Sequence, residues 1–168
     1  VFRDWLDITP RQAYELLEKD PEAFSTATPS PGDLAGAYRK VGETAESLLF
    51  ITVSSKVSTL HNVAMAARGL VKDELPGTTI EVLDSRTCTG AEGFVVMAAA
   101  RAAAEGKSLA EAIDAASEVR ERVDLFFVLD TVRHAYRTGR VPKLASRVGS
   151  LLEVKPVMGW GDGGACFK

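Results

Sequence analysis

The chain has few cysteines and histidines and no long apolar run, and each shortage excludes a class of function. Its 168 residues include two cysteines and two histidines at unrelated spacings, which are too few ligands for the usual structural zinc sites. Cys88 and Cys166 are therefore expected to be unpaired, reduced thiols. No stretch approaches the roughly 20 consecutive apolar residues that cross a bilayer. Neither a metal site nor a transmembrane segment is expected.

Basic clusters and nucleotide-binding motifs are also missing. The net charge is -3, and no cluster of lysine and arginine stands out, so nucleic acid is not an expected partner. There is no Walker A motif and no G-x-G-x-x-G. The start of the chain lacks the basic-then-apolar pattern of a secretory signal, and the cytoplasm is the expected compartment. The composition, 46% hydrophobic and 26% charged, is that of an ordinary globular protein.

The stretch from Ile51 to Leu70 combines three patterns that together suit an anion. It begins β-branched and apolar, as a buried strand does, and continues with a short segment rich in hydroxyl groups, residues 54–59. Apolar residues then recur at helical spacing. Strand, polar turn and helix in this order present hydroxyls and free N–H groups at a helix N-terminus, where one small anionic group is favoured.

Strands alternate with helices through the first two thirds of the chain. Ser47–Val53 and Thr78–Leu83 are predicted strands, and helices are predicted from Gly90 to Glu105 and from Ser108 to about Arg122. The alternation favours a parallel sheet flanked by helices, in which ligands bind beyond the carboxyl ends of the strands. A second hydroxyl-rich turn, residues 84–89, follows the second strand and falls at that same edge.

Two earlier helices and a different final third complete the prediction. Thr9 and Ser30 are predicted N-caps, each followed by proline, and Ser108 begins a capping box. The predictions for the last third are a strand at Asp124–Leu129, a helix carrying Val132, Ala135 and Tyr136 and ending at 138–140, a short helix at Pro142–Val148, an extended segment at Leu151–Trp160 and a turn at Gly161–Gly164.

Five blocks of the sequence occur in the order of similar blocks in a known family. They are TATPSPGDL at 26–34, VSSKVSTLHNVA at 53–64, EVLDSRTCTGAEG at 81–93, LDTVRHAYRTGRV at 129–141 and VGSLLEVKPVM at 148–158. The first resembles T-S-Q-P-S-P-G-D-F, and the second resembles I-S-S-x-L-S-G-T-Y-Q-S-A, of the DegV family of bacterial fatty-acid-binding proteins. One block alone is a weak signal, but the ordered set covers almost the whole chain and is specific.

The resemblance implies a fold and a function. It implies an α/β lobe over residues 1–122, lacking the family's first strand, and the beginning of a second α/β lobe over residues 123–168, with most of that lobe missing. A long-chain fatty acid would lie between the lobes and be presented to a partner fatty acid kinase, with no cofactor and no catalysis by the carrier itself.

The resemblance also assigns site residues. Thr26 and Ser58 match the family's threonine and serine that hold the carboxylate, and Thr59 and Ser54 flank them as further ligand-binding residues. Secondary positions along the acyl tunnel are Ala27, Ser85 and Phe127, and Arg140 is the candidate for partner contact. The sequence departs from the family where Thr59 replaces a glycine, Thr28 replaces a glutamine and Thr138 replaces a glycine.

Two other functions stay open at this stage. Ser58 and His61 are three residues apart and share a predicted helix face, so a small Ser–His hydrolase is one alternative, although no G-x-S-x-G elbow frames the serine. An interaction module that has lost its ligand is the other. Ser58 can also serve simply as a helix cap, and Phe127 can be an ordinary core residue.

Overall fold

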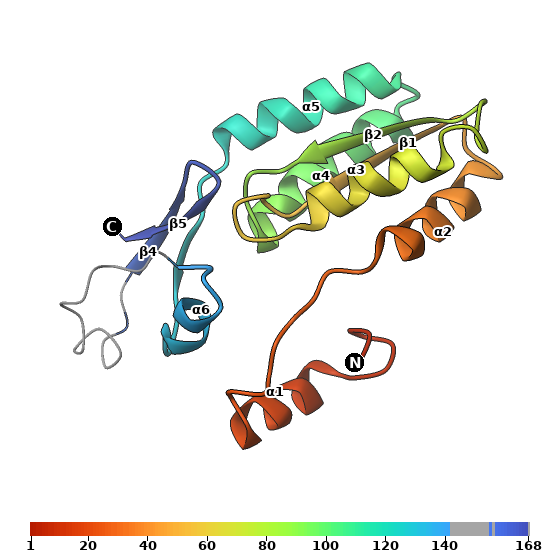
Figure 1. Ribbon diagram of the computed structural model, residues 1–168. Helices are drawn as coiled ribbons and strands as arrows, with labels where there is room; N and C mark the ends of the chain where they lie inside the picture. Colours follow the sequence, from red (N-terminus) through yellow and green to blue (C-terminus); the bar gives the residue numbers. More distant parts are fainter. Residues whose placement is uncertain (142–154, 156, 168) are drawn as a thin grey trace.

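The computed structural model describes residues 1–141, 155 and 157–167, and the arrangement of its elements is seen in Figure 1. In chain order the elements are α1 (Pro10–Lys19), α2 (Pro31–Gly42), β1 (Ser47–Thr52), α3 (Leu60–Val71), β2 (Thr79–Asp84), α4 (Thr89–Ala104), α5 (Leu109–Arg122), β3 (Phe126–Val128), α6 (Arg133–Arg137), β4 (Val157–Gly161) and β5 (Gly164–Phe167).

The first half of the chain is built on a parallel pair of strands. β1 and β2 run in register from Ser47 opposite Thr79 to Thr52 opposite Asp84. Helices α2 and α3 lie on one face of this pair and α4 and α5 on the other (Figure 1). Both strands therefore end at one edge, and the turns that follow them start side by side. The predicted parallel sheet with flanking helices is confirmed.

Alternating side chains of β1 explain how both faces are covered. Leu48 and Phe50 pack toward α2 and α3, where the ring of Tyr38 meets Phe50 edge-on at a centroid distance of 5.9 Å. Leu49 and Ile51 pack toward α4 and α5. A strand buried on two faces reads as a continuous apolar run, as this one does. Small residues allow the helices to approach, because Ala67, Ala99 and Ala116 are all buried at these interfaces.

A second, antiparallel sheet follows in the order β3-β4-β5. Its core is formed by Val132, Val141, Met158 and Ala165. The predicted turn at Gly161–Gly164 is confirmed as the two-residue loop between β4 and β5, where Asp162 and Gly163 have φ of 49° and 77°. Positive φ at both central residues is what a type I′ hairpin requires.

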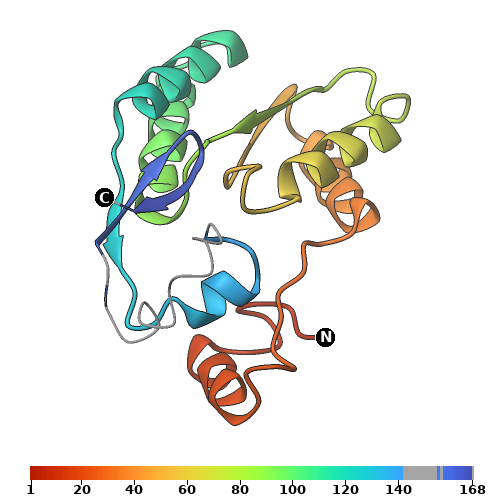
Figure 2. The ribbon, with the colours of Figure 1, turned by 60° about the vertical axis from the view of Figure 1, so that its left-hand side comes forward.

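Three capping boxes start helices where the sequence predicts them. The side chains of Thr9, Ser30 and Ser108 accept the N–H of the residue three positions on, and Gln12, Asp33 and Glu111 return the contact. Helix α1 lies apart from the parallel sheet in both ribbon views (Figures 1 and 2) and reaches α2 through a loop at residues 20–30. Residues of this loop contact α6, through Arg137, and the start of α3, through Thr59.

The remaining expectations differ mainly at their boundaries. The strand expected at Asp124–Leu129 is shorter, Phe126–Val128. Of the extended segment expected at Leu151–Trp160, the described part contains the strand Val157–Gly161, and residues 151–154 and 156 lie outside the described residues. The helix expected at Pro142–Val148 lies outside the described residues. Cys88 and Cys166 are free thiols, as predicted. Across residues 1–141, 155 and 157–167, no helix is long and apolar enough to cross a bilayer.

Candidate functional site

The two hydroxyl-rich turns meet at the carboxyl edge of the parallel sheet and are joined by Asp84. Its carboxylate accepts the Ser55 N–H at 3.2 Å, from the turn after β1, and the Arg86 N–H at 2.8 Å, from the turn after β2. The Ser54 N–H also donates to the Thr87 carbonyl at 2.8 Å. These bonds fix the turns against one another, so their side chains share one surface.

The first turn leads directly into the N-terminus of α3. Ser58 is not the N-cap of α3, because the N-cap is Thr59. The Ser58 Oγ instead accepts the N–H of Leu60, the first helical residue, at 3.2 Å. The Thr59 side chain makes no capping bond, and the first turn carries no acidic residue. N–H groups at the start of a helix lack intrahelical partners, so this end of α3 suits an external anion.

The loop between α1 and α2 reaches the same helix end. Thr28 Oγ1 and Thr59 Oγ1 are 3.2 Å apart and form a hydrogen bond. Thr28 therefore brings the segment that contains Thr26 and Ala27 next to the residue that follows Ser58. Thr26 and Ala27 are both exposed. The structure thus brings together the two segments that carry the predicted carboxylate ligands.

Two of the predicted site hydroxyls are fully buried and donate to backbone carbonyls. Ser54 is fully buried, and its Oγ donates to the Gly163 carbonyl at the tip of the β4–β5 hairpin while accepting the Lys56 N–H at 3.2 Å. Ser85 is also fully buried, and its Oγ donates to the Thr87 carbonyl at 3.2 Å. Both serines hold the turns in shape, and their proposed contacts with a ligand stay predictions.

Phe127 and Arg140, predicted to lie further from the carboxylate, both come from the second part of the chain. Phe127 is half-buried in the core of the antiparallel sheet, with its ring 6.4 Å from that of Trp160. The Trp160 indole N–H donates to the Arg86 carbonyl at 2.7 Å, so this sheet docks on the second hydroxyl-rich turn. Arg140 is exposed, and its Nε donates to the Val57 carbonyl at 3.2 Å.

The charges at the edge are arranged around Asp84. Burial by itself would raise the pKa of Asp84, but the hydrogen bonds from Ser55 and Arg86, with a contribution from His61, hold that pKa below its usual range. Glu92, in the first turn of α4, has a raised pKa because it is partly buried and faces the charge of Asp84. Lys56 and Arg86 are exposed cations on the two turns.

The side chains required for a Ser–His hydrolase are not joined. The Ser58 Oγ is engaged with the N–H of Leu60, and in the described part of the chain no hydrogen bond links it to His61. His61 Nδ1 is buried and, among those same residues, has no hydrogen-bond partner. A nucleophile needs its general base within hydrogen-bond reach, so the spacing alone does not assemble this pair. No group of three or more potential metal ligands occurs in the described residues either.

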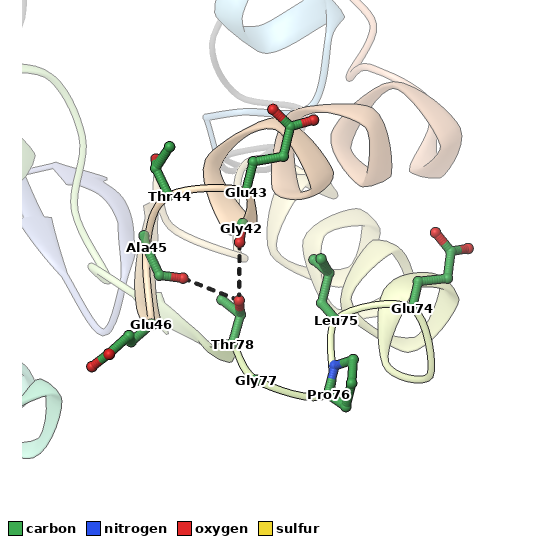
Figure 3. A pocket seen from close by; sticks show the side chains of 10 residues that line it. All are labelled: Gly42, Glu43, Thr44, Ala45, Glu46, Glu74, Leu75, Pro76, Gly77 and Thr78. Atoms are coloured by element: carbon green, nitrogen blue, oxygen red, sulfur yellow. Dashed lines mark hydrogen bonds between the residues drawn. The ribbon is translucent and has the colours of Figure 1, made fainter.

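A surface hollow lies at the opposite edge of the parallel sheet. It measures about 410 Å³ and is seen in Figure 3 at the amino ends of the strands, opposite the hydroxyl-rich turns. Its rim carries Glu43, Glu46 and Glu74, and Thr78 closes it with a 3.0 Å bond from Oγ1 to the Ala45 carbonyl. An acidic rim repels a carboxylate, so this hollow does not suit an anionic ligand.

Asp84 and Arg137 organise this edge, but the sequence indicates the role of only one of them. Asp84 had a usable signal, because an aspartate directly after a strand often turns back on the following N–H groups. Arg137 had none. Its guanidinium donates to the carbonyls of Glu22 and Phe24, and backbone carbonyls leave no trace in a sequence.

Fold and site together define a class: an α/β protein whose parallel sheet ends in hydroxyl-rich turns beneath a second sheet. The chain belongs to the DegV family, since the model of that family, described as "Uncharacterised protein, DegV family", matches residues 1–166.

Known relatives agree with this assignment. A DegV domain-containing protein of Streptococcus pyogenes serotype M1 is 33% identical over 131 residues, which are 78% of this chain and 46% of the relative. Among solved structures, a fatty-acid-binding DegV family protein of Thermus thermophilus matches with a TM-score of 0.83 and 30% identity over 99% of this chain and 58% of its own. The fatty acid kinase B3 protein of Streptococcus pneumoniae, loaded with linoleic acid, matches with a TM-score of 0.86 and 28% identity over the same shares. The chain thus spans about half the length of its curated relatives.

Proposed function

We propose that this protein binds a long-chain fatty acid and that Thr26 and Ser58 hold its carboxylate. The observation that carries the proposal is the 3.2 Å bond between Thr28 and Thr59, which joins the loop of Thr26 to the helix end beside Ser58. The proposal places two hydroxyl donors from different segments at one helix N-terminus, an arrangement that would suit a carboxylate. The ligands of the Thermus and pneumococcal proteins, a fatty acid and linoleic acid, support the same ligand class.

The carboxylate and the acyl chain of the ligand would contribute different amounts of binding free energy. Each hydrogen bond from a hydroxyl to the carboxylate contributes about 1.5–3 kcal/mol, and the dipole of α3 adds about 0.3–1 kcal/mol. Burial of the acyl chain contributes about 0.8 kcal/mol per methylene, or about 10 kcal/mol for a dozen. Chain burial then dominates affinity, and the hydroxyls determine which end of the ligand lies at the edge of the sheet.

The proposal extends to the rest of the ligand and to a partner. The acyl chain would run between a lobe formed by residues 1–122 and a second lobe begun by residues 123–168, past Ala27, Ser85 and Phe127. Thr59 would complete the surroundings of the carboxylate, and Ser54 would support them from behind by holding the first turn in shape. We propose further that the protein catalyses nothing itself and presents the acid to a fatty acid kinase, with Arg140 at the contact. Because such a kinase uses ATP, this step would belong to the cytoplasm.

Ligand release followed by titration tests the proposal. Mass spectrometry of the intact natural protein, purified from bacteria and denatured, is expected to release a C14–C18 acid. Ser58→Ala and Thr26→Val should each weaken binding of a fluorescent fatty acid about tenfold or more. The corresponding fatty alcohol should bind worse than the acid to the unmodified protein.

Matched controls separate the site from general damage. Ser47→Ala and Thr79→Val remove the same hydroxyls from exposed positions at the start of β1 and β2, at the opposite edge of the sheet, and should bind like the unmodified protein. If all four variants bind alike, the carboxylate lies elsewhere. If stable, monomeric protein neither carries nor takes up a fatty acid, the chain is an interaction module without this ligand.

A further inference from the structure

Arg137 on α6 reaches the loop at residues 20–30. Its Nη1 donates to the Glu22 carbonyl at 3.2 Å and its Nη2 to the Phe24 carbonyl at 2.6 Å. The second of these bonds is partly buried. A guanidinium presents its donors in a rigid planar fork, so one side chain fixes two carbonyls of the loop at once.

The loop depends on this anchor because it has no helix or strand of its own over residues 21–30. The local bonds of Ala23 and Phe24 lead back only to Asp20, at the end of α1. Beyond them, Thr28 is tied to Thr59 at 3.2 Å. Thr26 therefore lies between two anchor points, with Phe24 two residues before it and Thr28 two residues after it.

The turn after α6 also reaches the other hydroxyl segment. Gly139, with φ of 75°, reverses the chain, and Arg140 Nε donates to the Val57 carbonyl at 3.2 Å. Val57 directly precedes Ser58. One short segment, from Arg137 to Arg140, therefore contacts both the loop of Thr26 and the turn of Ser58.

We propose that Arg137 is a positioning residue for the carboxylate site. It holds the loop at Glu22 and Phe24 so that the Thr26 hydroxyl reaches the carboxylate oxygen that Ser58 also approaches. This inference rests on the proposed function, and it assigns to Arg137 an effect on the head group of the ligand rather than on the acyl chain. If Arg137 only stabilised the fold, its substitution would weaken the binding of every ligand alike.

The test compares head groups and uses a double-mutant cycle. Arg137→Met keeps most of the aliphatic bulk and removes both donors, and it should weaken binding of a C16 fatty acid about tenfold, as loss of one charge-assisted hydrogen bond does. Binding of the C16 alcohol should stay unchanged. Arg137→Lys, with one ammonium group in place of the fork, should give a smaller loss and provides a second variant if the first does not fold. Arg133→Met, at an exposed position of the same helix, should bind like the unmodified protein.

The cycle with Thr26→Val isolates the route of the effect. If Arg137 acts through Thr26, adding Arg137→Met to Thr26→Val should cost little further acid affinity. Full additivity, or an equal loss for acid and alcohol in both Arg137 variants, overturns the inference while the unmodified protein still binds the acid. If the unmodified protein binds no acid, the proposed function itself fails, and the inference fails with it.

Discussion

Replacing Asp84 by asparagine should loosen the carboxyl edge of the parallel sheet without removing any packed volume. Asp84 accepts the N–H groups of Ser55 and Arg86, and its position at the end of β2 makes it the link between the two hydroxyl-rich turns. Arg86 has φ of 54°, a conformation uncommon for residues other than glycine, and the bond from its N–H helps to hold it there.

The expected magnitude follows from these two bonds. Asparagine keeps one acceptor oxygen but loses the charge. A hydrogen bond to a charged group contributes about 1 kcal/mol more than one to a neutral group, so two bonds give a loss of about 2 kcal/mol in the free energy of unfolding. For a chain of this length, that corresponds to a decrease in Tm of about 4–8 °C. Asp114→Asn, at an exposed position of α5, is the matched control and should change Tm little.

The pH dependence gives a second, independent reading of the same prediction. The pKa of Asp84 is lowered in the folded protein, so its contribution to stability is fully present above the pKa of an unfolded aspartate, about 4. It is lost as the pH falls through the lower, folded value. The Tm values of the unmodified protein and of Asp84→Asn should therefore differ at pH 7 and converge as the pH falls below about 4. A difference that equals that of Asp114→Asn, or that persists unchanged in acid, would refute the role given to Asp84.

Two further substitutions test how the turns and the hairpin fit together. Gly163→Ala should lower the urea midpoint more than Gly139→Ala does. Both glycines have positive φ, but of the two only Gly163 has side chains close to a new Cβ, with Ser54 Oγ at 3.1 Å and Lys56 Cγ at 3.3 Å. Equal losses would show that backbone strain alone lowers the stability. Thr89→Gly should raise stability by about 1 kcal/mol in the same assay, since Thr89 has φ of 54° and β-branched residues are strained there; a loss would show that its side chain is needed.

The parallel sheet and its helices could be predicted because their signals are local. The run from Leu48 to Ile51 is apolar at every position, as a strand covered on both faces must be. Thr9, Ser30 and Ser108 each satisfy N–H groups within three residues of themselves. Patterns of this kind are complete within a short window, so the sequence alone defines them.

Helix α4 shows where the local pattern is insufficient. Its sequence is apolar at most positions, yet Val95 and Ala99 are buried while Phe94, Val96 and Met97 are exposed. A helix with apolar residues on all sides gives no preferred direction by itself. Which side of α4 is buried is decided by its neighbours: α5, where Ala116 allows close approach, and Leu49 and Leu83 of the strands.

The two serines of the first turn show why the site itself was harder to predict than the fold. Ser54 and Ser58 are four residues apart in one hydroxyl-rich segment, and either can donate to a carboxylate. Ser54 follows the strand so closely that it is fully buried, and its hydroxyl is turned to the Gly163 carbonyl, 109 residues away. Ser58 lies further along, where α3 begins, and is only partly buried.

The partners that distinguish the roles of side chains at this site are backbone carbonyls of distant segments, for Ser54 as for Arg137 and Arg140. Every residue type except proline offers the same backbone groups, so only the folded chain identifies which carbonyl is bound and therefore which hydroxyl is left for a ligand.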